Sequence, residues 1–235
     1  MFEKIRSLRQ FCFILKQTYK RYFPKRTDFG QCGKNTFIEY PIIIDSPKNL
    51  HVEENVKIRS MLRVINSPTE NVYIKKYTVI ASDCMIITNN HKSTVTVPQF
   101  LLGSSHVNDI SKDITIEEDV WVGARVILLP GAHLCRGCVV GAGSIISSEI
   151  PPYSVVVGQG RIVARKFDKD GIKKHEKALY KKEERMSEYI IDKLFKDYLD
   201  NMRTYGYDKP LTEKDKETIC LQKRLFNFIE PSYEP

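Results

Sequence analysis

The sequence predicts a mainly β protein in which short strands form a coil, with a helix before the coil and helices after it. Three observations support this fold class. Apolar residues recur every six positions in the middle of the chain, whereas they recur every three or four positions near the N-terminus and after residue 167. A period of three or four indicates amphipathic helices, and a sustained period of six indicates a repeat architecture. The expected domains are 1–26, 27–167 and 168–235.

The size and composition of the chain fit one globular body with an appendage. It has 235 residues, of which 42% are hydrophobic, so it can bury a substantial core but is short for two full domains. Its six cysteines are scattered and lack the dense, even spacing of a secreted disulfide framework. We therefore expect a reduced, cytoplasmic protein without disulfides.

Residues 1–26 are predicted to form a basic amphipathic helix. They contain eight of the lysines and arginines but one acidic residue, and so carry most of the net charge of +8. Because the basic residues are concentrated here and not spread over a face, we expect no nucleic-acid binding. The apolar run at 11–15 is too short for an export signal or a membrane span.

Two interpretations of this helix stay open. It packs against its own domain or a neighbouring subunit, or its residues 1–23 contact the anionic inner face of the cytoplasmic membrane. Both interpretations use its apolar residues, which are Phe2, Ile5, Leu8, Cys12, Leu15, Tyr19 and Tyr22.

Six consecutive hexads start at Ile116 and read IEEDVW, VGARVI, LLPGAH, LCRGCV, VGAGSI and ISSEIP. An aliphatic residue occupies the first column of each hexad, and small or β-branched residues fill most of the fifth. Less regular hexads start between Val52 and Ile86, so the repeat covers about residues 50–157. Three short strands per turn of a triangular coil satisfy this period, with both columns pointing inward. Burying each aliphatic side chain contributes roughly 1.5–3 kcal/mol.

The segment WVGARVILLPGAHLCRGCVVGAGSIISSEIPPYSVVVGQ resembles the hexapeptide-repeat acyltransferases, in particular the branch that O-acetylates sugars and xenobiotics. The resemblance covers about residues 50–168. It implies a left-handed parallel β-helix, a homotrimer and acetyl-CoA as co-substrate. The left hand is an exception to the usual rule for β crossovers, and it rests on the resemblance alone.

The hexads stop after Ile86 and resume at Ile116, and the interruption begins at TNNHKSTVTVPQF. In the resembling enzymes a loop leaves the coil just after a histidine, which acts as general base toward the acceptor hydroxyl. The resemblance assigns this catalytic role to His91. A histidine suits the step because its ordinary pKa of about 6.5 leaves it largely neutral at cell pH. His106, in the same interruption, is the rival base.

The excursion at 92–113 is predicted to fold over the acceptor site. An internal loop of about twenty residues is usually functional, and in the resembling enzymes it lies at the junction of two subunits. Phe100, Leu101 and Leu102 would give it an apolar underside. The substrate-binding candidates are Asn89, Asn90, Phe100 and His106. The candidates for orienting the His91 imidazole are a backbone carbonyl and the side chains of Asp83, Asn89, Asn90 and Asp109.

The donor site is expected on the glycine-rich corners of the coil and just beyond them. Small residues let a ligand approach backbone amides, and the pantetheine arm of acetyl-CoA is itself an amide chain. Basic residues after the coil suit the CoA phosphates, and the resemblance puts the single tryptophan beside the acetyl group. The cofactor-binding candidates are Trp121, Gly123, Ala124, Gly141, Ala142, Ser144, Arg161, Arg165 and Lys166. The family pattern Gly-x-Pro-Ala has no proline here, which leaves the path around Arg161 open.

No metal is predicted. Cys84 and Cys138 fall in the fifth hexad column, so we expect them in the core and not as nucleophiles. Cys135 and Cys138 form a single CxxC pair, which is a weak zinc signal without a second pair, and the register places them on different faces. The remaining histidines, His51, His133 and His175, have no context comparable to that of His91.

After Phe167 the chain becomes rich in Lys, Glu and Leu, and it is predicted to be a helical extension through residue 235. A break at Pro210 precedes a last helix at about 213–228.

The expected function is acetyl-CoA-dependent O-acetyl transfer to a sugar hydroxyl of a bacterial surface polysaccharide or its precursor. The alternatives are O-acetylation of a xenobiotic such as an antibiotic, N-acetylation of an amino sugar, and a β-helix scaffold without catalysis. His91 argues against the scaffold. The basic N-terminal helix favours an envelope carbohydrate over a drug, because such acceptors are made at the inner membrane face. The identity of the acceptor and the length of the acyl group stay open.

Overall fold

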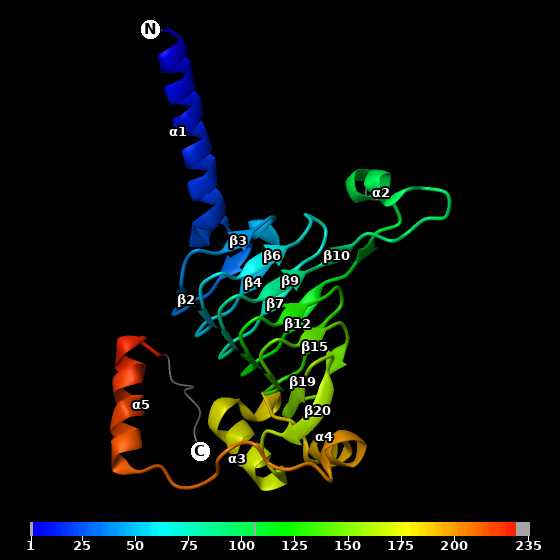
Figure 1. The fold of residues 1–235 in the computed structure, drawn as a ribbon. Coiled ribbons are helices and arrows are strands. Elements are labelled where there is room, and N and C mark those ends of the chain that lie inside the picture. Colours follow the sequence, from blue (N-terminus) through cyan, green and yellow to red (C-terminus); the bar gives the residue numbers. More distant parts are fainter. Residues whose placement is uncertain (1, 106, 229–235) are drawn as a thin grey trace.

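A computed structural model describes residues 2–105 and 107–228. Three sheets of short strands wrap into a triangular coil of about six turns (Figure 1). Neighbouring strands within each sheet are parallel, except that the last strand of the second sheet, β20, turns back antiparallel to β19. The first sheet contains β1 (Gln31–Cys32), β4 (Leu50–Val52), β7 (Val72–Ile74), β12 (Ile114–Ile116), β15 (His133–Leu134) and β18 (Glu149–Ile150).

The other two sheets complete each turn. The second contains β2 (Phe37–Ile38), β5 (Lys57–Ile58), β8 (Val79–Ile80), β13 (Trp121–Val122), β16 (Val139–Val140), β19 (Ser154–Val157) and β20 (Arg161–Arg165). The third contains β3 (Ile43–Ile44), β6 (Arg63–Ile65), β9 (Met85–Ile87), β14 (Ile127–Leu128) and β17 (Ile145–Ile146).

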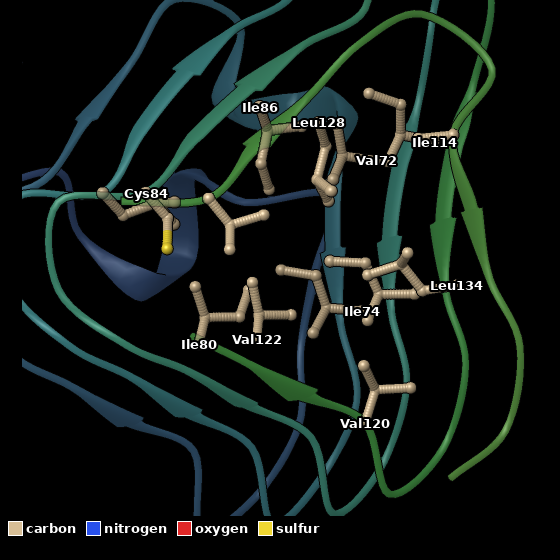
Figure 2. Packing of buried hydrophobic residues seen from close by; sticks show 14 of the residues in the cluster. Val72, Ile74, Ile80, Cys84, Ile86, Ile114, Val120, Val122, Leu128 and Leu134 are labelled. Carbon is tan, nitrogen blue, oxygen red and sulfur yellow. The ribbon is translucent and has the colours of Figure 1, made fainter. Parts of the chain in front are cut away.

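The hexad columns form the core as predicted. Side chains from successive turns stack inside the coil, so that Ile80 lies beside Val122 and Ile86 beside Leu128 (Figure 2). All six first-column residues from Ile116 onward are buried, and so are all six fifth-column residues, including Cys138. Cys84 is buried as well. The prediction that these two cysteines lie in the core is confirmed.

The coil begins one turn earlier than the sequence repeat. Strands β1 to β3 form a complete turn before residue 50, with Ile42 and Ile44 in the core. The hexad pattern misses this turn because the segment TFIEYPIII places three isoleucines in a row, which obscures the six-residue period.

The corners of the coil use left-handed backbone. Asn55, Asp119 and Gly137 come shortly before β5, β13 and β16 of the second sheet and have φ values of 56°, 56° and 70°. Asn, Asp and Gly tolerate this region best. The polar and glycine positions of the hexads therefore set the turns, while the aliphatic positions fill the interior.

Helix α1 (Phe2–Tyr22) projects away from the coil (Figure 1). The side chains of residues 10–21 are exposed, among them Phe11, Phe13 and Leu15. The interpretation that this helix packs against its own domain is therefore wrong for these residues, because the described chain offers them no covering surface. A neighbouring subunit or a membrane surface stays open. Among the described residues, no helix combines the length and the apolar character needed to span a bilayer.

The chain after the coil is helical. It forms α3 (Lys169–Leu179), α4 (Glu188–Leu194), a π-helical turn (Phe195–Leu199) and α5 (Glu213–Leu225). Short 3-10 turns occur at Arg26–Asp28, Pro47–Asn49 and Lys182–Glu184. A second apolar cluster joins the coil to this extension through Tyr153, Ile172, Ile191, Leu194, Phe195 and Leu199.

The last helix returns to the start of the coil. It ends at Leu225, three residues before the predicted end. Just after it, the Phe226 ring meets Phe37 edge to face with 5.6 Å between centroids, and the ammonium of Lys57 lies 3.6 Å from the centre of the Phe226 ring. The extension therefore contacts the coil at both ends of the second sheet.

Candidate active site

The interruption of the repeat is a hairpin that leaves the coil after β9. Strand β10 (Asn89–Asn90) pairs antiparallel with β11 (Ile110–Ser111), and α2 (Gln99–Ser105) lies between them. The register pairs Asn89 with Ser111 and Asn90 with Ile110. One step further along this ladder, His91 faces Asp109.

These two side chains are in contact. His91 Nδ1 lies 3.0 Å from Asp109 Oδ1. A carboxylate only accepts hydrogen bonds, so Nδ1 is the donor, and the neutral imidazole then carries its lone pair on Nε2. The His91 side chain is 39% exposed and that of Asp109 is 11% exposed. A histidine held in one tautomer by a more buried carboxylate is a suitable general base.

The structure selects one of the orienting groups that the sequence leaves open. Asp109 contacts the imidazole, whereas Asp83 lies at an exposed corner before β9. The sequence alone could not rank Asp109, because eighteen residues separate it from His91 and only the hairpin register brings them together.

A pocket adjoins the pair. It has a volume of about 380 Å³ and is lined by Ser67, Pro68, Thr69, Asn89, Asp109 and Ser111. The buried carboxylate of Glu70 accepts hydrogen bonds from the hydroxyls of Ser67 and Thr69, which fixes both side chains. Sequence reasoning missed these two hydroxyl residues, since they lie on the preceding turn of the coil.

The other substrate-binding candidates differ in position. Asn89 lines the pocket, while Asn90, the next residue of the strand, is exposed. In the single chain Phe100 is 89% exposed and Leu101 is exposed as well, whereas Leu102 is buried. Their contact with a neighbouring subunit stays a prediction. His106 lies outside the described residues.

Trp121 lies on the outer face of the second sheet. Its side chain is 51% exposed, because the neighbouring Val122 takes the inward position on β13. It borders a pocket of about 330 Å³, which is lined by Tyr77, Val79, Asp119, Val120, Trp121, Val139, Lys166 and Tyr205. Most of this lining is apolar or aromatic.

The corner glycines serve the coil itself. A Cβ atom on Gly123 would lie 2.6 Å from the Ala142 nitrogen, and one on Gly141 would lie 2.9 Å from Val157 Cγ1. The missing side chains therefore make room for the next turn of the coil, and contact of these two glycines with the donor stays a prediction.

The three other corner candidates lie at different depths. Ser144 is buried, and its hydroxyl donates to the Gly141 carbonyl at 2.6 Å, so that hydroxyl faces inward. Ala124 is half-buried and Ala142 is exposed. Of these three, Ala142 is the best placed for contact with a ligand.

Two of the three basic candidates hold the C-terminal extension in place. Lys166 Nζ lies 2.6 Å from Asp119 Oδ2, which also lies 2.8 Å from His175 Nε2. Arg165 Nε donates to the Thr204 hydroxyl at 2.9 Å. The expectation that Arg165 and Lys166 bind phosphates missed these contacts, because the partners lie more than 35 residues away in the sequence. The third candidate, Arg161, is exposed on β20.

The contacts with Lys166 and His175 lower the pKa of the Asp119 carboxyl group. Burial raises the pKa of its carboxyl group, but the hydrogen bond from His175 and the charge of Lys166 lower it by more, and the net pKa lies below the usual range. The carboxylate form therefore joins a corner of the coil to β20 and α3.

The sequence matches known proteins over the coil. Residues 113–148 match a family described as "Bacterial transferase hexapeptide (six repeats)". A galactoside O-acetyltransferase from Lactococcus lactis is 28% identical over 149 residues, which cover 63% of this chain and 68% of the relative. The galactoside O-acetyltransferase of Escherichia coli K12 is 28% identical over 150 residues, which cover 60% and 66%. Over the coil, the chain is therefore similar to hexapeptide-repeat transferases and to galactoside O-acetyltransferases.

Solved structures of hexapeptide-repeat acetyltransferases share the fold. One from Vibrio cholerae covers 70% of this chain and 94% of its own, with 22% identity and a TM-score of 0.56. A maltose O-acetyltransferase from Clostridium difficile covers 69% and 88%, with 26% identity and a TM-score of 0.52. The predicted fold class, a left-handed parallel β-helix, and the predicted enzyme class, an acyltransferase, are confirmed.

Proposed function

We propose that this enzyme transfers an acetyl group from acetyl-CoA to a sugar hydroxyl in a bacterial surface polysaccharide or its precursor. The observation that carries the proposal is the contact between His91 and Asp109 beside a polar pocket. The named relatives support it, because galactoside and maltose O-acetyltransferases act on carbohydrates by their names.

The geometry supports base catalysis by His91. Nε2 takes the proton from the acceptor hydroxyl as its oxygen attacks the carbonyl carbon of the thioester. A C–O bond forms, the C–S bond breaks, and the CoA sulfur leaves as a thiolate that recovers the proton from the imidazolium. Asp109 stabilises that imidazolium while it exists. Positioned base catalysis of this kind typically contributes about 10²- to 10⁴-fold.

The pocket beside the base favours a carbohydrate acceptor over an apolar drug. Hydroxyls of Ser67, Thr69 and Ser111 and the amide of Asn89 line it. Hydroxyl and amide groups both donate and accept hydrogen bonds, as the hydroxyls of a sugar do. A largely apolar xenobiotic would form no hydrogen bonds with these groups.

The surface at Trp121 suits the donor. Val79, Val139 and Tyr205 give its pocket an apolar lining that can accept the aliphatic parts of a pantetheine arm. The hexapeptide-repeat acetyltransferase from Vibrio cholerae has also been solved in complex with acetyl coenzyme A, and that structure covers 70% of this chain with a TM-score of 0.55. Arg161, exposed on β20, is our proposed partner for the CoA phosphates.

We also propose a homotrimer in which two chains share each site. Trp121 lies on the second sheet, whereas His91 follows the last strand of a turn on the third sheet. In a threefold assembly the donor surface of one chain can face the base of the next. The exposed basic helix α1 is proposed to contact an anionic membrane surface.

An assay of free CoA tests the proposed function. The full chain is incubated with acetyl-CoA and, separately, with neutral sugars, surface polysaccharides, amino sugars and antibiotics. We expect CoA release with a neutral carbohydrate and a product whose mass increases by one acetyl group. CoA release with antibiotics alone, or with amino sugars through an amide product, would replace the proposal by the corresponding alternative.

A further inference from the structure

We propose that Glu117, His133 and Cys135 form a zinc site on the outer face of the first sheet, apart from the acetyl-transfer site. One ligand atom from each of these residues lies within 4.8 Å of the others. They come from two consecutive turns of the coil. Because β12 pairs with β15 and Ile116 is opposite Leu134, the next step of the ladder places Glu117 opposite Cys135.

Neighbouring groups orient two of the three ligands. Glu117 Oε2 accepts a hydrogen bond from the Arg136 backbone nitrogen at 2.8 Å, which directs Oε1 toward His133 Nε2 at 3.0 Å. On the other side of the ring, His133 Nδ1 lies 3.4 Å from Glu149 Oε2. A carboxylate on the second ring nitrogen is the usual support of a metal-binding histidine, because it fixes the ring and its tautomer.

The charge of the cluster favours a cation. Two carboxylates, Glu117 and Glu149, flank one imidazole. Arg136 donates a hydrogen bond to Glu117 through its backbone nitrogen only. Its positively charged guanidinium pairs instead with Glu118 at 3.3 Å and Glu176 at 3.1 Å. The simplest alternative is a His133 ring that bridges the two carboxylates without a metal. That alternative does not explain why the Cys135 sulfur also lies within 4.8 Å of the Glu117 and His133 ligand atoms.

The donor set selects the ion. A carboxylate oxygen, an imidazole nitrogen and a thiolate sulfur together suit zinc, whereas magnesium and calcium prefer oxygen ligands. Three protein ligands leave a fourth position for water. The CxxC pattern of Cys135 and Cys138 did not reveal this cluster, because it pairs Cys135 with Cys138, whose side chain is buried in the core.

The position of the cluster separates its role from catalysis. Glu117 and Cys135 follow strands of the first sheet, whereas the excursion with His91 follows the third sheet. Zinc would join two adjacent turns directly, with Glu149 as support from a third. We therefore expect it to stabilise the coil and to leave acetyl transfer unchanged.

Cobalt binding tests the site, since tetrahedral Co²⁺ reports thiolate ligation by absorption. The experiment uses the full-length protein with the substitutions Cys12→Ser and Cys220→Ser, because these two exposed thiols would otherwise bind Co²⁺ and add background absorption. We expect one equivalent of Co²⁺ to give a thiolate charge-transfer band, and zinc to displace it. Cys135→Ser should abolish the band, and His133→Ala should weaken Co²⁺ binding at least tenfold.

His51→Ala is the matched control. His51 occupies the same outward column of the first sheet as His133 and contacts Asn71 at 3.0 Å, so its removal should leave the Co²⁺ spectrum unchanged. Zinc should also raise the melting temperature of the parent protein by several degrees, and this measurement does not depend on how the variants fold. A band that persists in Cys135→Ser, or an unchanged melting temperature with excess zinc, would overturn the proposal.

Discussion

Asp109 Oδ1 lies 3.0 Å from His91 Nδ1 because the two residues occupy facing positions where the β10–β11 hairpin opens into the excursion. The loop that interrupts the repeat thus supplies the partner of the histidine at which the interruption begins. The contact ties the geometry of the base to the closure of the hairpin.

Replacing His91 by alanine should lower turnover by roughly 10²- to 10⁴-fold, because the transition state loses its proton acceptor. Binding of acetyl-CoA should change little, since the loss falls on the chemical step. The measurement is steady-state kinetics of CoA release together with donor titration. Turnover within a few-fold of the parent would remove His91 from the mechanism.

Replacing Asp109 by asparagine should lower kcat by roughly 10- to 100-fold. A hydrogen bond to a charged group contributes about 1.5–3 kcal/mol, and each 1.36 kcal/mol corresponds to about a factor of ten in rate. Steady-state kinetics of CoA release measure the loss. Asp83→Asn, at an exposed corner, is the control and should behave like the parent. Equal effects of the two substitutions would argue against a positioning role for Asp109.

Deleting residues 1–23 should abolish cosedimentation with anionic vesicles and leave transfer to a soluble acceptor intact. The described part of α1 exposes apolar and basic side chains together, and each basic group near such a surface contributes about 1 kcal/mol at most. Attachment should therefore weaken with salt. Analytical ultracentrifugation of the truncated chain provides the control. If the expected trimer is lost, α1 is a subunit contact and the membrane interpretation is excluded.

Two adjacent isoleucines of β17 allow a test of the core. Ile146 points into the coil and is buried, whereas Ile145 points outward and is 41% exposed. Ile146→Ala should lower the free energy of unfolding by about 2–5 kcal/mol, the usual range for a cavity of this size. Ile145→Ala should cost far less. Urea denaturation measures both, and similar losses would contradict the inward assignment of the first hexad column.

Acid should weaken the joint between the coil and the C-terminal extension. The folded-state pKa of Asp119 is lowered, so its carboxylate contributes stability above its unfolded pKa of about 3.9. That contribution is lost as the pH falls further, through the folded-state pKa. Asp119→Asn should therefore reduce the fall in unfolding free energy between about pH 4 and pH 2, whereas the exposed Asp197→Asn should not. The measurement is urea denaturation at a series of pH values. If the unfolding free energy of Asp119→Asn and of the parent falls equally between about pH 4 and pH 2, the stabilising role of the Asp119 carboxylate is contradicted.

The regular features of the protein could be predicted from its sequence, because they depend on spacing alone. The period of six identifies the inward residues from Ile116 to Ile150, and the break in that period points to His91. The contacts that complete the sites are not periodic. Asp109 reaches His91, and Glu117 and Glu149 reach His133, only through strand register. Asp119 reaches Lys166 and His175 only through packing of the extension. Neither relationship is visible in a local stretch of sequence.

The antiparallel strand β20 covers the last parallel strand of the second sheet. A parallel coil ends in strands whose backbone groups can pair with another chain, and such edges promote end-to-end aggregation. By folding back on β19, β20 occupies the free edge of the second sheet with strand from the same molecule. Loss of this fold-back would leave the edge of β19 open to pairing with another chain.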